Sequence, residues 1–393
     1  MKGAAGGTDG RWVGVGHSFA PDAAGAGRAA LAAARAGREP CLVLVFASIA
    51  HDLGALVAAV RAELGPVTAL AGCTTAGELS QVGGGRGSVV VAALGGDGLS
   101  AEVAVGLGAS TRQREAGAEA AACLAAIDRP NRVLLLLTPG FVSHQEEIVR
   151  GAYSVTGATV PVVGGASGDD LTMTGTHQIA GDAVLTDAVV GIAVGSDHPL
   201  AVSMRHGWRK VGEPMVVSTS DGTTVSQLDD QPALDVYLGR LGAPAETYHD
   251  PLALNRFALV HPLGLQRLNG EDIRVPGEVD YESRSLICTA DVPRGALVWL
   301  MEGDEVSVIE AAAGACSNAL ELLGGGPVAG ALVFDCVGRR LILGDDLVEK
   351  EVAAIRSSLG DVPVAGFFTY GEIARSRGSS GVHNETFVVM ALG

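Results

Sequence analysis

The sequence predicts an α/β fold with two domains, built from repeated strand-helix-strand-Gly-rich loop-strand units with mixed sheets. A glycine-rich loop occurs three times, and each copy ends in a glycine followed by an acid: the loops are Gly72–Glu78, Gly164–Asp169 and Gly366–Glu372. An apolar run and a helical segment precede each loop, and another apolar run follows it. Recurrence of one local pattern along a chain indicates repeated structural units.

A predicted strand and a predicted helix lie between the glycine- and alanine-rich N-terminus and the first unit, which begins at residue 42. Residues 12–18 are predicted to form a strand, and residues 23–36 a helix, because alanine is the best helix former. Residues 52–64 carry Leu53, Leu56, Val57 and Val60 at helical spacing, which predicts an amphipathic helix that packs on a sheet. Apolar runs complete the unit with predicted strands at residues 42–46, 67–71 and 89–94.

The second and third units have the same order of elements. In the second, strands are predicted at residues 133–137, 160–163 and 189–194, and a helix at 145–156; a predicted strand at 100–106 and a helix at 111–126 precede this unit. In the third, strands are predicted at residues 331–334, 364–365 and 387–392, and a helix at 347–359; a predicted helix at 307–323 precedes it. The run 133–137 is apolar at every position, as expected for a strand that is covered on both faces.

The character of the chain changes near residues 198–202. Alanine-rich helices become fewer after this point, and glycine and proline turns become more frequent. We therefore predict two domains, residues 11–200 and residues 201–393. Between the second and third units, strands are predicted at residues 211–221, 257–262 and 285–289, and a helix at 232–241.

Composition excludes several classes of function. The net charge of −17 argues against nucleic-acid binding and against docking on an anionic membrane, because both need a basic surface. No apolar run approaches the roughly 18 residues that span a bilayer. The six cysteines are dispersed without a CxxC pair, and the N-terminus lacks the apolar region of a secretory signal. We predict a soluble, cytoplasmic protein without membrane insertion.

The three loops are the predicted ligand-binding surface. Glycines allow close approach to backbone N–H groups, and equivalent strand ends of α/β sheets are where ligands bind. We expect Glu78 and Glu372 to hold a ligand ammonium group, and Arg375 to take a carboxylate; Arg377 lies nearby. The alternative is that the loops are only turns of a duplicated scaffold. The predicted ligand-binding residues are Gly72, Cys73, Thr74, Thr75, Gly77, Glu78, Gly165, Ser167, Asp169, Phe368, Thr369, Tyr370, Gly371, Glu372 and Arg375.

Several motifs together resemble the FIST proteins, which have an N-terminal and a C-terminal FIST domain. Gly72–Glu78 and Gly164–Asp170 resemble the N-terminal domain. Three further segments resemble parts of the C-terminal domain. They are His206-Gly207-Trp208, Asp230-Gln231-Pro232-Ala233-Leu234-Asp235-Val236-Tyr237, and Gly366–Ile373 with His383-Asn384-Glu385-Thr386. The resemblance extends from about Val13 to Gly393.

This resemblance implies a sensory module for a small molecule such as an amino acid. Since the chain has no room for an output domain, it also implies a separate signalling protein as partner. A subset of the family resembles haem-binding nitric-oxide sensors, so haem is an alternative cofactor with a His, Cys, Met or Tyr ligand. No histidine of this sequence is matched to that role.

An enzyme is the remaining alternative. Cys73 lies in a glycine-rich loop where exposed N–H groups can lower a thiol pKa, but a small buried residue is the simpler interpretation. Ser48 near His51, and Ser143 beside His144, bring nucleophile and base types together without a GxSxG elbow. No HxH, HExxH or CxxC spacing is present, so a zinc site is not predicted.

Overall fold

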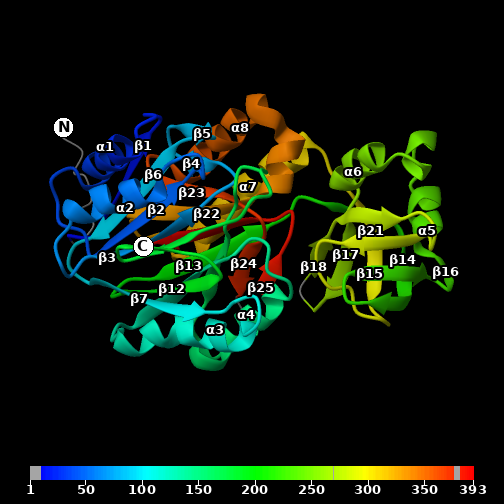
Figure 1. Ribbon diagram of the computed structural model, residues 1–393, viewed down its shortest axis with the longest axis horizontal. Coiled ribbons are helices and arrows are strands. Elements are labelled where there is room, and N and C mark those ends of the chain that lie inside the picture. The colour runs from blue at the N-terminus through cyan, green and yellow to red at the C-terminus, as the bar shows by residue number, and fades with distance from the viewer. Residues whose placement is uncertain (1–9, 269, 376–380) are drawn as a thin grey trace.

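Three six-stranded mixed sheets form the body of the protein, and a smaller lobe is attached at one end (Figure 1). The computed structural model describes residues 10–268, 270–375 and 381–393. Helices alternate with strands along most of the body, which confirms the predicted α/β class. No helix within these ranges is long and apolar enough to cross a membrane.

The three sheets share one strand order. The first is β1 (Trp12–Ser18), β6 (Val89–Gly95), β2 (Leu42–Ala47), β3 (Ala69–Thr74), β10 (Gln178–Ala180) and β11 (Ala183–Leu185). The second is β7 (Leu99–Leu107), β12 (Ala188–Ser196), β8 (Asn131–Thr138), β9 (Val162–Ala166), β24 (Glu372–Arg375) and β25 (Gly381–His383). The third is β13 (Leu200–Arg205), β26 (Phe387–Leu392), β22 (Gly330–Cys336), β23 (Val364–Thr369), β4 (Glu78–Ser80) and β5 (Gly83–Gly85).

Each sheet contains one parallel pair, formed by the two strands that flank a helix. These pairs are β2 with β3, β8 with β9, and β22 with β23. The strands were predicted as apolar runs because they are buried on both faces, and β2, β12 and β26 are buried at every position.

The hairpin that follows each glycine-rich loop completes the sheet of a different unit. β4 pairs with β23, β10 with β3, and β24 with β9, all antiparallel. The three units therefore exchange hairpins in a cycle. As a consequence, the three loops are brought to one region of the molecule although they are far apart in the sequence.

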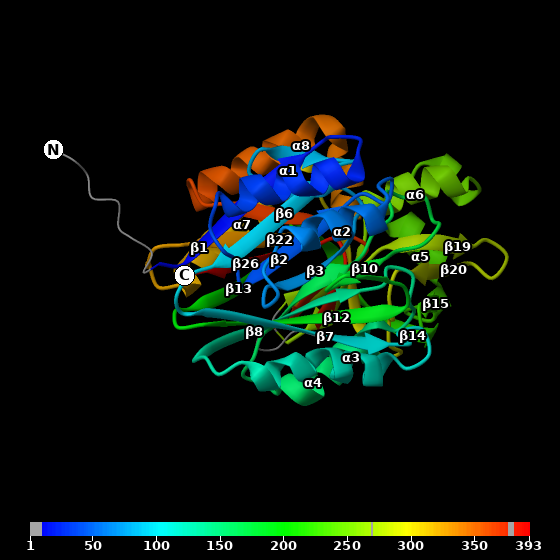
Figure 2. The same cartoon turned by 60° about the vertical axis from the view of Figure 1, so that its left-hand side comes forward.

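Helices cover the outer faces of the sheets (Figure 2). Apolar side chains from all three sheets form one buried cluster at the centre. The helices are α1 (Ala23–Arg35), α2 (Leu53–Ala62), α3 (Gln113–Ala121), α4 (Gln145–Thr156), α7 (Glu305–Leu322) and α8 (Val337–Leu359). α8 begins earlier than predicted and is kinked at Gly344, whose φ is 62°. α2, α4 and α8 each lie beside the hairpin contributed by another unit.

The smaller lobe is inserted between β13 and α7 in the third unit. Its sheet contains β14 (Arg209–Asp221), β15 (Thr224–Leu228), β16 (Gln231–Pro232), β17 (Leu263–Arg267), β18 (Gly270–Arg274), β19 (Pro276–Asp280), β20 (Ser285–Cys288) and β21 (Leu297–Glu302). α5 (Ala233–Arg240) and α6 (Pro251–Val260) pack against it. The predicted strand at residues 257–262 was wrong. Asp250 caps α6 by accepting from the Leu252 N–H, and Pro251 occupies its first turn, so this apolar run continues a helix.

Candidate functional site

The three glycine-rich loops contact one another through backbone hydrogen bonds. The first loop meets the third, the third meets the second, and the second meets the first, so the loops form a closed ring. The bonds are Ala76 N to Phe368 O (2.9 Å), Phe368 N to Gly77 O (2.8 Å), Tyr370 N to Ala166 O (3.1 Å), Ala166 N to Gly371 O (2.8 Å), Gly168 N to Thr74 O (3.0 Å) and Asp170 N to Thr75 O (3.0 Å).

The glutamates of the first and third loops accept hydrogen bonds from other residues of the protein. The Thr75 hydroxyl donates to Glu78, and the other carboxylate oxygen of Glu78 accepts from the Ser88 N–H at 3.1 Å and the Ser88 hydroxyl at 2.5 Å. Glu372 repeats this arrangement with the Thr369 hydroxyl and with the Thr386 N–H at 3.1 Å. Both glutamates are fully buried. Their carboxylates therefore brace the loops.

The strand register places Gln178 in the second unit where Glu78 and Glu372 stand in the others. Each of these residues begins the hairpin strand that pairs with another unit: Glu78 faces Phe367, Glu372 faces Gly165, and Gln178 faces Cys73. Residues 168–177 extend the second loop before this strand. Asp169 stabilises the extension, since it accepts from the Thr174 N–H at 2.7 Å and from the Tyr370 hydroxyl at 2.5 Å.

Most of the other predicted site residues are also buried. Cys73 is 0% exposed, and burial raises the pKa of its thiol far above the usual value. A protonated, inaccessible thiol is a poor nucleophile. Full burial extends to Thr74, Thr75, Ser167, Asp169, Phe368 and Thr369.

A change of charge at Glu78 is expected to alter the pH dependence of stability. Burial raises the pKa of Glu78 from about 4.5 to about 7. A carboxyl whose pKa is higher in the folded than in the unfolded state contributes stability below pH 4.5, and this contribution is lost as the pH rises to about 7. Glu78→Gln removes the titration and copies Gln178. We expect unfolding free energies, measured by urea denaturation, to favour the variant increasingly across this range. A constant difference would contradict the assignment, and exposed Glu63→Gln serves as the control.

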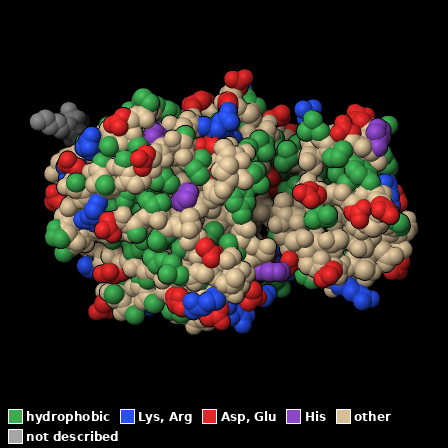
Figure 3. Space-filling view, in the orientation of Figure 1, with side chains coloured by type: hydrophobic (Ala, Val, Ile, Leu, Met, Phe, Trp, Pro, Cys, Tyr) green, Lys and Arg blue, Asp and Glu red, His purple; other side chains and the backbone are tan. Residues whose placement is uncertain are grey.

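Two adjoining cavities lie where the third loop faces the smaller lobe. We call them together the interlobe cleft; the space-filling view shows the body and the lobe meeting at a recess (Figure 3). The first cavity has a volume of about 500 Å³ and is lined by Tyr370 and Gly371, by residues 140–146 before and within α4, and by residues 221–223 and 289–291 of the lobe. The second has a volume of about 540 Å³. Both are lined by His144, Glu146 and Asp291, which makes them neighbours.

Arginines dominate the second cavity of the cleft. Arg150 pairs with Glu147, and Arg267 pairs with Asp272 at 2.6 Å. Arg375 differs from these, because its guanidinium lies 3.3 Å from the ring centre of Tyr153 and pairs with no carboxylate of the described residues. Stacking on a ring holds the guanidinium plane while its N–H groups stay available to an anion. Arg377 lies outside the described residues.

The same cavity also offers an acceptor for a cationic group. Oε1 of Glu146 is buried and has no hydrogen-bond partner in the described part of the chain. Among the described residues, the nearest cation is Arg274, whose Nη2 lies 3.9 Å away, beyond hydrogen-bond distance. A buried carboxylate oxygen without a partner is costly, so a bound donor would be favoured there.

Predicted ligand-binding residues therefore form one part of the cleft, and residues without a local sequence signal form another. Tyr370, Gly371 and Arg375 line it as predicted positions. Glu146, Asp291 and Arg274 were missed, since nothing in the local sequence shows that α4 and the inserted lobe face each other. The segment His383-Asn384-Glu385-Thr386, which resembles part of the C-terminal FIST domain, could have indicated the cleft, because Asn384 lines it.

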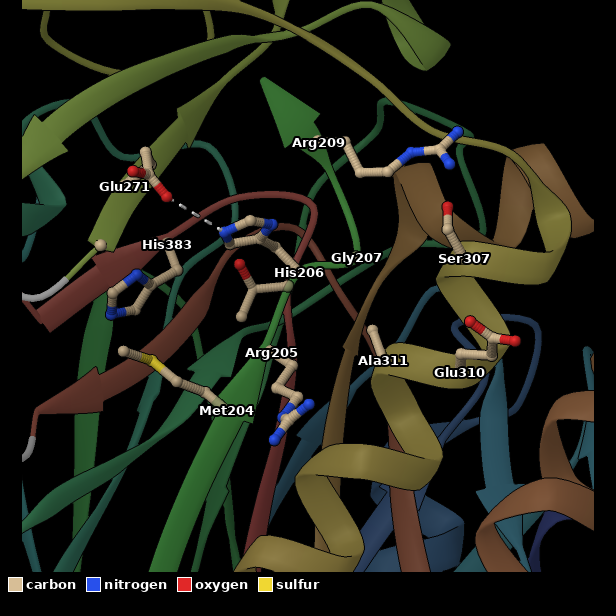
Figure 4. A pocket seen from close by; sticks show the side chains of 12 residues that line it. Met204, Arg205, His206, Gly207, Arg209, Glu271, Ser307, Glu310, Ala311 and His383 are labelled. Carbon is tan, nitrogen blue, oxygen red and sulfur yellow. Dashed lines mark ion pairs between the residues drawn. The ribbon is translucent and has the colours of Figure 1, made fainter. Parts of the chain in front are cut away.

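A separate cavity of about 470 Å³ lies at the junction of the body and the lobe (Figure 4). His206 and His383 both line it, and Figure 4 shows the His206 ring directed toward Glu271 of the lobe. The Trp208 N–H donates to Nδ1 of His206 at 3.0 Å, and burial lowers the pKa of His206 to about 4. Nδ1 of His383 lies 3.4 Å from Asp272, and its Nε2 lies 2.9 Å from the Ala374 carbonyl oxygen.

These two histidines do not fit the haem alternative as they are held. A neutral imidazole that binds iron through Nε2 carries its hydrogen on Nδ1. In His206 that atom accepts a hydrogen bond, and in His383 both ring nitrogens face oxygen atoms. The residues described in the structure also contain no group of three or more His, Cys, Asp or Glu side chains arranged to hold a metal ion.

Comparison with known proteins gives the family. The FIST N domain matches residues 41–231, and the FIST C domain matches residues 233–375. The chain belongs to the FIST family. FIST domains are associated with sensing and signal transduction. The predicted resemblance is therefore confirmed.

Two relatives of this FIST protein match almost its whole length, and a third matches about a third of it. An uncharacterised protein of Mycobacterium tuberculosis is 29% identical over 400 residues, which are 95% of this chain and 97% of the relative. An uncharacterised protein of Mycobacterium bovis is 30% identical over 405 residues, with the same shares covered. An uncharacterised protein of Methanocaldococcus jannaschii is 30% identical over 155 residues, 37% of this chain and 30% of the relative.

Proposed function

We propose that this FIST protein is a cytoplasmic sensor that binds a small zwitterionic metabolite, such as an amino acid, in the interlobe cleft. The observation that carries the proposal is that Arg375 and Glu146 line one cavity. Arg375 stacks on Tyr153 and pairs with no carboxylate of the described residues, and the buried Oε1 of Glu146 has no hydrogen-bond partner among those residues. A carboxylate and an ammonium group on one small molecule satisfy both. FIST membership supports the sensory role.

The chemistry of recognition follows from charge and shape. An Arg guanidinium binds a carboxylate with two parallel hydrogen bonds, which fixes orientation as well as adding energy. Glu146 would accept from the ammonium group and gain the partner it lacks. Cavities of about 500 and 540 Å³ are within the range of small-molecule sites.

The position of the cleft suggests how binding is signalled. Its walls come from both the body and the lobe, which are joined by the short segments 206–208 and 303–304. A ligand that contacts both walls favours one arrangement of the lobe over others, and hinges of a few residues permit such a change. We propose that a separate signalling protein recognises this arrangement.

We further propose that the three units arose as an internal repeat. The division into domains at residue 200 would then mark the start of the third unit.

The proposal is tested with the full chain by scanning fluorimetry and calorimetry against a panel of amino acids and organic acids. We expect one class to raise the melting temperature, and Arg375→Gln to weaken its binding by about tenfold or more, as for a lost charge-assisted hydrogen bond. Glu146→Gln should weaken binding of the zwitterion more than binding of the matching acid without an ammonium group. Arg256→Gln, on an exposed face of the lobe, is the matched control. Binding that is equal in wild type and Arg375→Gln would refute the site.

A further inference from the structure

A smaller cavity of about 190 Å³ lies at the first loop, on the body and away from the lobe's residues. It is lined by Ala76, by Arg86, by Asp170 and Leu171 of the second loop's extension, and by the start of α8 up to Asp345. It belongs neither to the interlobe cleft nor to the cavity of Figure 4. Its volume is below the roughly 300 Å³ at which sites for larger small molecules begin, so its ligand must be small.

This cavity occupies the position of the interlobe cleft in another unit. Thr75 donates to Glu78 three residues on, and Thr369 donates to Glu372 three residues on, so Ala76 corresponds to Tyr370. Ala76 lies near the start of α8, whereas Tyr370 lies near the start of α4. The pattern of hairpin exchange thus places a hollow at both loops.

At the second loop, the position that corresponds to these cavities is filled by the protein itself. There the extension 168–177 brings Asp170 to the end of β2, where the Ser48 hydroxyl donates to Oδ2 of Asp170. The contact leaves Oδ1 of Asp170 buried without a hydrogen-bond partner among the described residues. Asp170 also lines the small cavity, so this unpartnered oxygen belongs to a residue of the cavity wall.

Two arginines of the cavity converge on one exposed carboxylate. Nη2 of Arg340 lies 2.9 Å from Asp345, and Nη2 of Arg86 lies 3.3 Å from the same side chain, which is 70% exposed. Nη1 of Arg340 donates to the Ala76 carbonyl at 2.6 Å, which fixes this guanidinium in the loop. The kink of α8 at Gly344 puts Asp345 in place. Asp345 thus occupies the position that an external anion would take.

We propose that this cavity binds the phosphate group of inorganic phosphate or of a small phosphate monoester. Arg340 and Arg86 would bind two phosphate oxygens after Asp345 swings into solvent. Oδ1 of Asp170 would accept from a phosphate hydroxyl, since a carboxylate can face an oxyanion only where the oxyanion carries a hydrogen. Sulfate has the same shape and carries no such hydrogen near neutral pH, so the site distinguishes the two ions.

Calorimetry on the full chain, at constant ionic strength, tests the proposal with inorganic phosphate, glycerol phosphate and sulfate. We expect phosphate to bind with one-to-one stoichiometry and sulfate to bind at least tenfold more weakly. Tighter binding of glycerol phosphate than of phosphate identifies a monoester as the ligand, and the reverse order identifies the free ion. Absence of phosphate binding, or equal binding of phosphate and sulfate, would overturn the proposal.

Variants separate the proposed site from nonspecific anion binding. Arg86→Gln should weaken phosphate binding about tenfold, whereas Asp345→Asn should tighten it severalfold because it removes the competing carboxylate. Asp170→Asn should abolish the discrimination against sulfate, and Asn tolerates the left-handed φ of 54° at this position. Arg28→Gln, an exposed arginine of α1, is the control for net charge. Failure of Asp345→Asn to change the affinity would contradict the role given to this residue. None of these outcomes depends on the ligand of the interlobe cleft.

Discussion

Gly366→Ala is expected to destabilise the protein by about 3 kcal/mol, at the upper end of overpacking costs. A β-carbon at this position would lie 1.8 Å from the Val333 carbonyl oxygen and 2.6 Å from the Val333 side chain. Neither can yield, since Val333 lies in the fully buried strand β22 that pairs with β23. The measurement is the free energy of unfolding from chemical denaturation.

Gly239→Ala provides the matched control for this prediction. Gly239 lies in α5, and a β-carbon there would have no neighbour within 4 Å. We expect this variant to be stabilised by roughly 0.5–1 kcal/mol, because alanine is the better helix former. Similar unfolding free energies for the two variants would show that the close approach of β22 and β23 is not required.

The same steric constraint explains why the first glycines of the loops recur. A β-carbon on Gly72 would lie 2.0 Å from the Val45 carbonyl oxygen, and one on Gly164 would lie 2.0 Å from that of Leu136. Each of these glycines belongs to the second strand of a parallel pair. Their recurrence in the sequence predicted ligand-binding loops. In the structure these glycines serve strand packing.

Arg339→Met is expected to destabilise the protein by about 3–5 kcal/mol, the range for breaking a buried ion pair. Arg339 is fully buried, and its guanidinium lies 2.5 Å from Asp335 and 2.5 Å from Glu351. Burial lowers the pKa of Arg339, but the charges of Asp335 and Glu351 raise it by a larger amount, so the net shift is upward. Without this cation, the buried carboxyl groups lose their counter-charge.

The result is checked by chemical denaturation beside Arg356→Gln, which changes an exposed arginine in the last turn of α8. Burial and the charge of Asp335 raise the pKa of Glu351, and burial raises that of Glu385 to about 8. Glu385 is ionised above about pH 8, so the difference between Arg339→Met and wild type should increase as the pH rises through that value. A loss below 1 kcal/mol at neutral pH would contradict the assignment.

Local sequence patterns were sufficient for the fold class and for many elements. α4 and β26 have the predicted bounds, residues 145–156 and 387–392. Helices on a sheet and strands buried on both faces leave a periodic or continuous apolar pattern, which a sequence displays directly. Where that pattern was ambiguous, as in residues 257–260, a cap at Asp250 decided in favour of a helix.

The sequence by itself determined the class of fold, the FIST resemblance and the recurrence of the loops, because these depend on neighbouring residues. Only the tertiary structure decided what the loops do. Hairpin strands of three or four residues carry too little pattern to show which sheet they join, and their exchange buries Glu78 and Glu372 within the ring. The exchange of hairpins likewise brings Arg375 and Glu146, from separate units, to one cavity. Such a site is made by contacts between distant segments, and no local pattern records them.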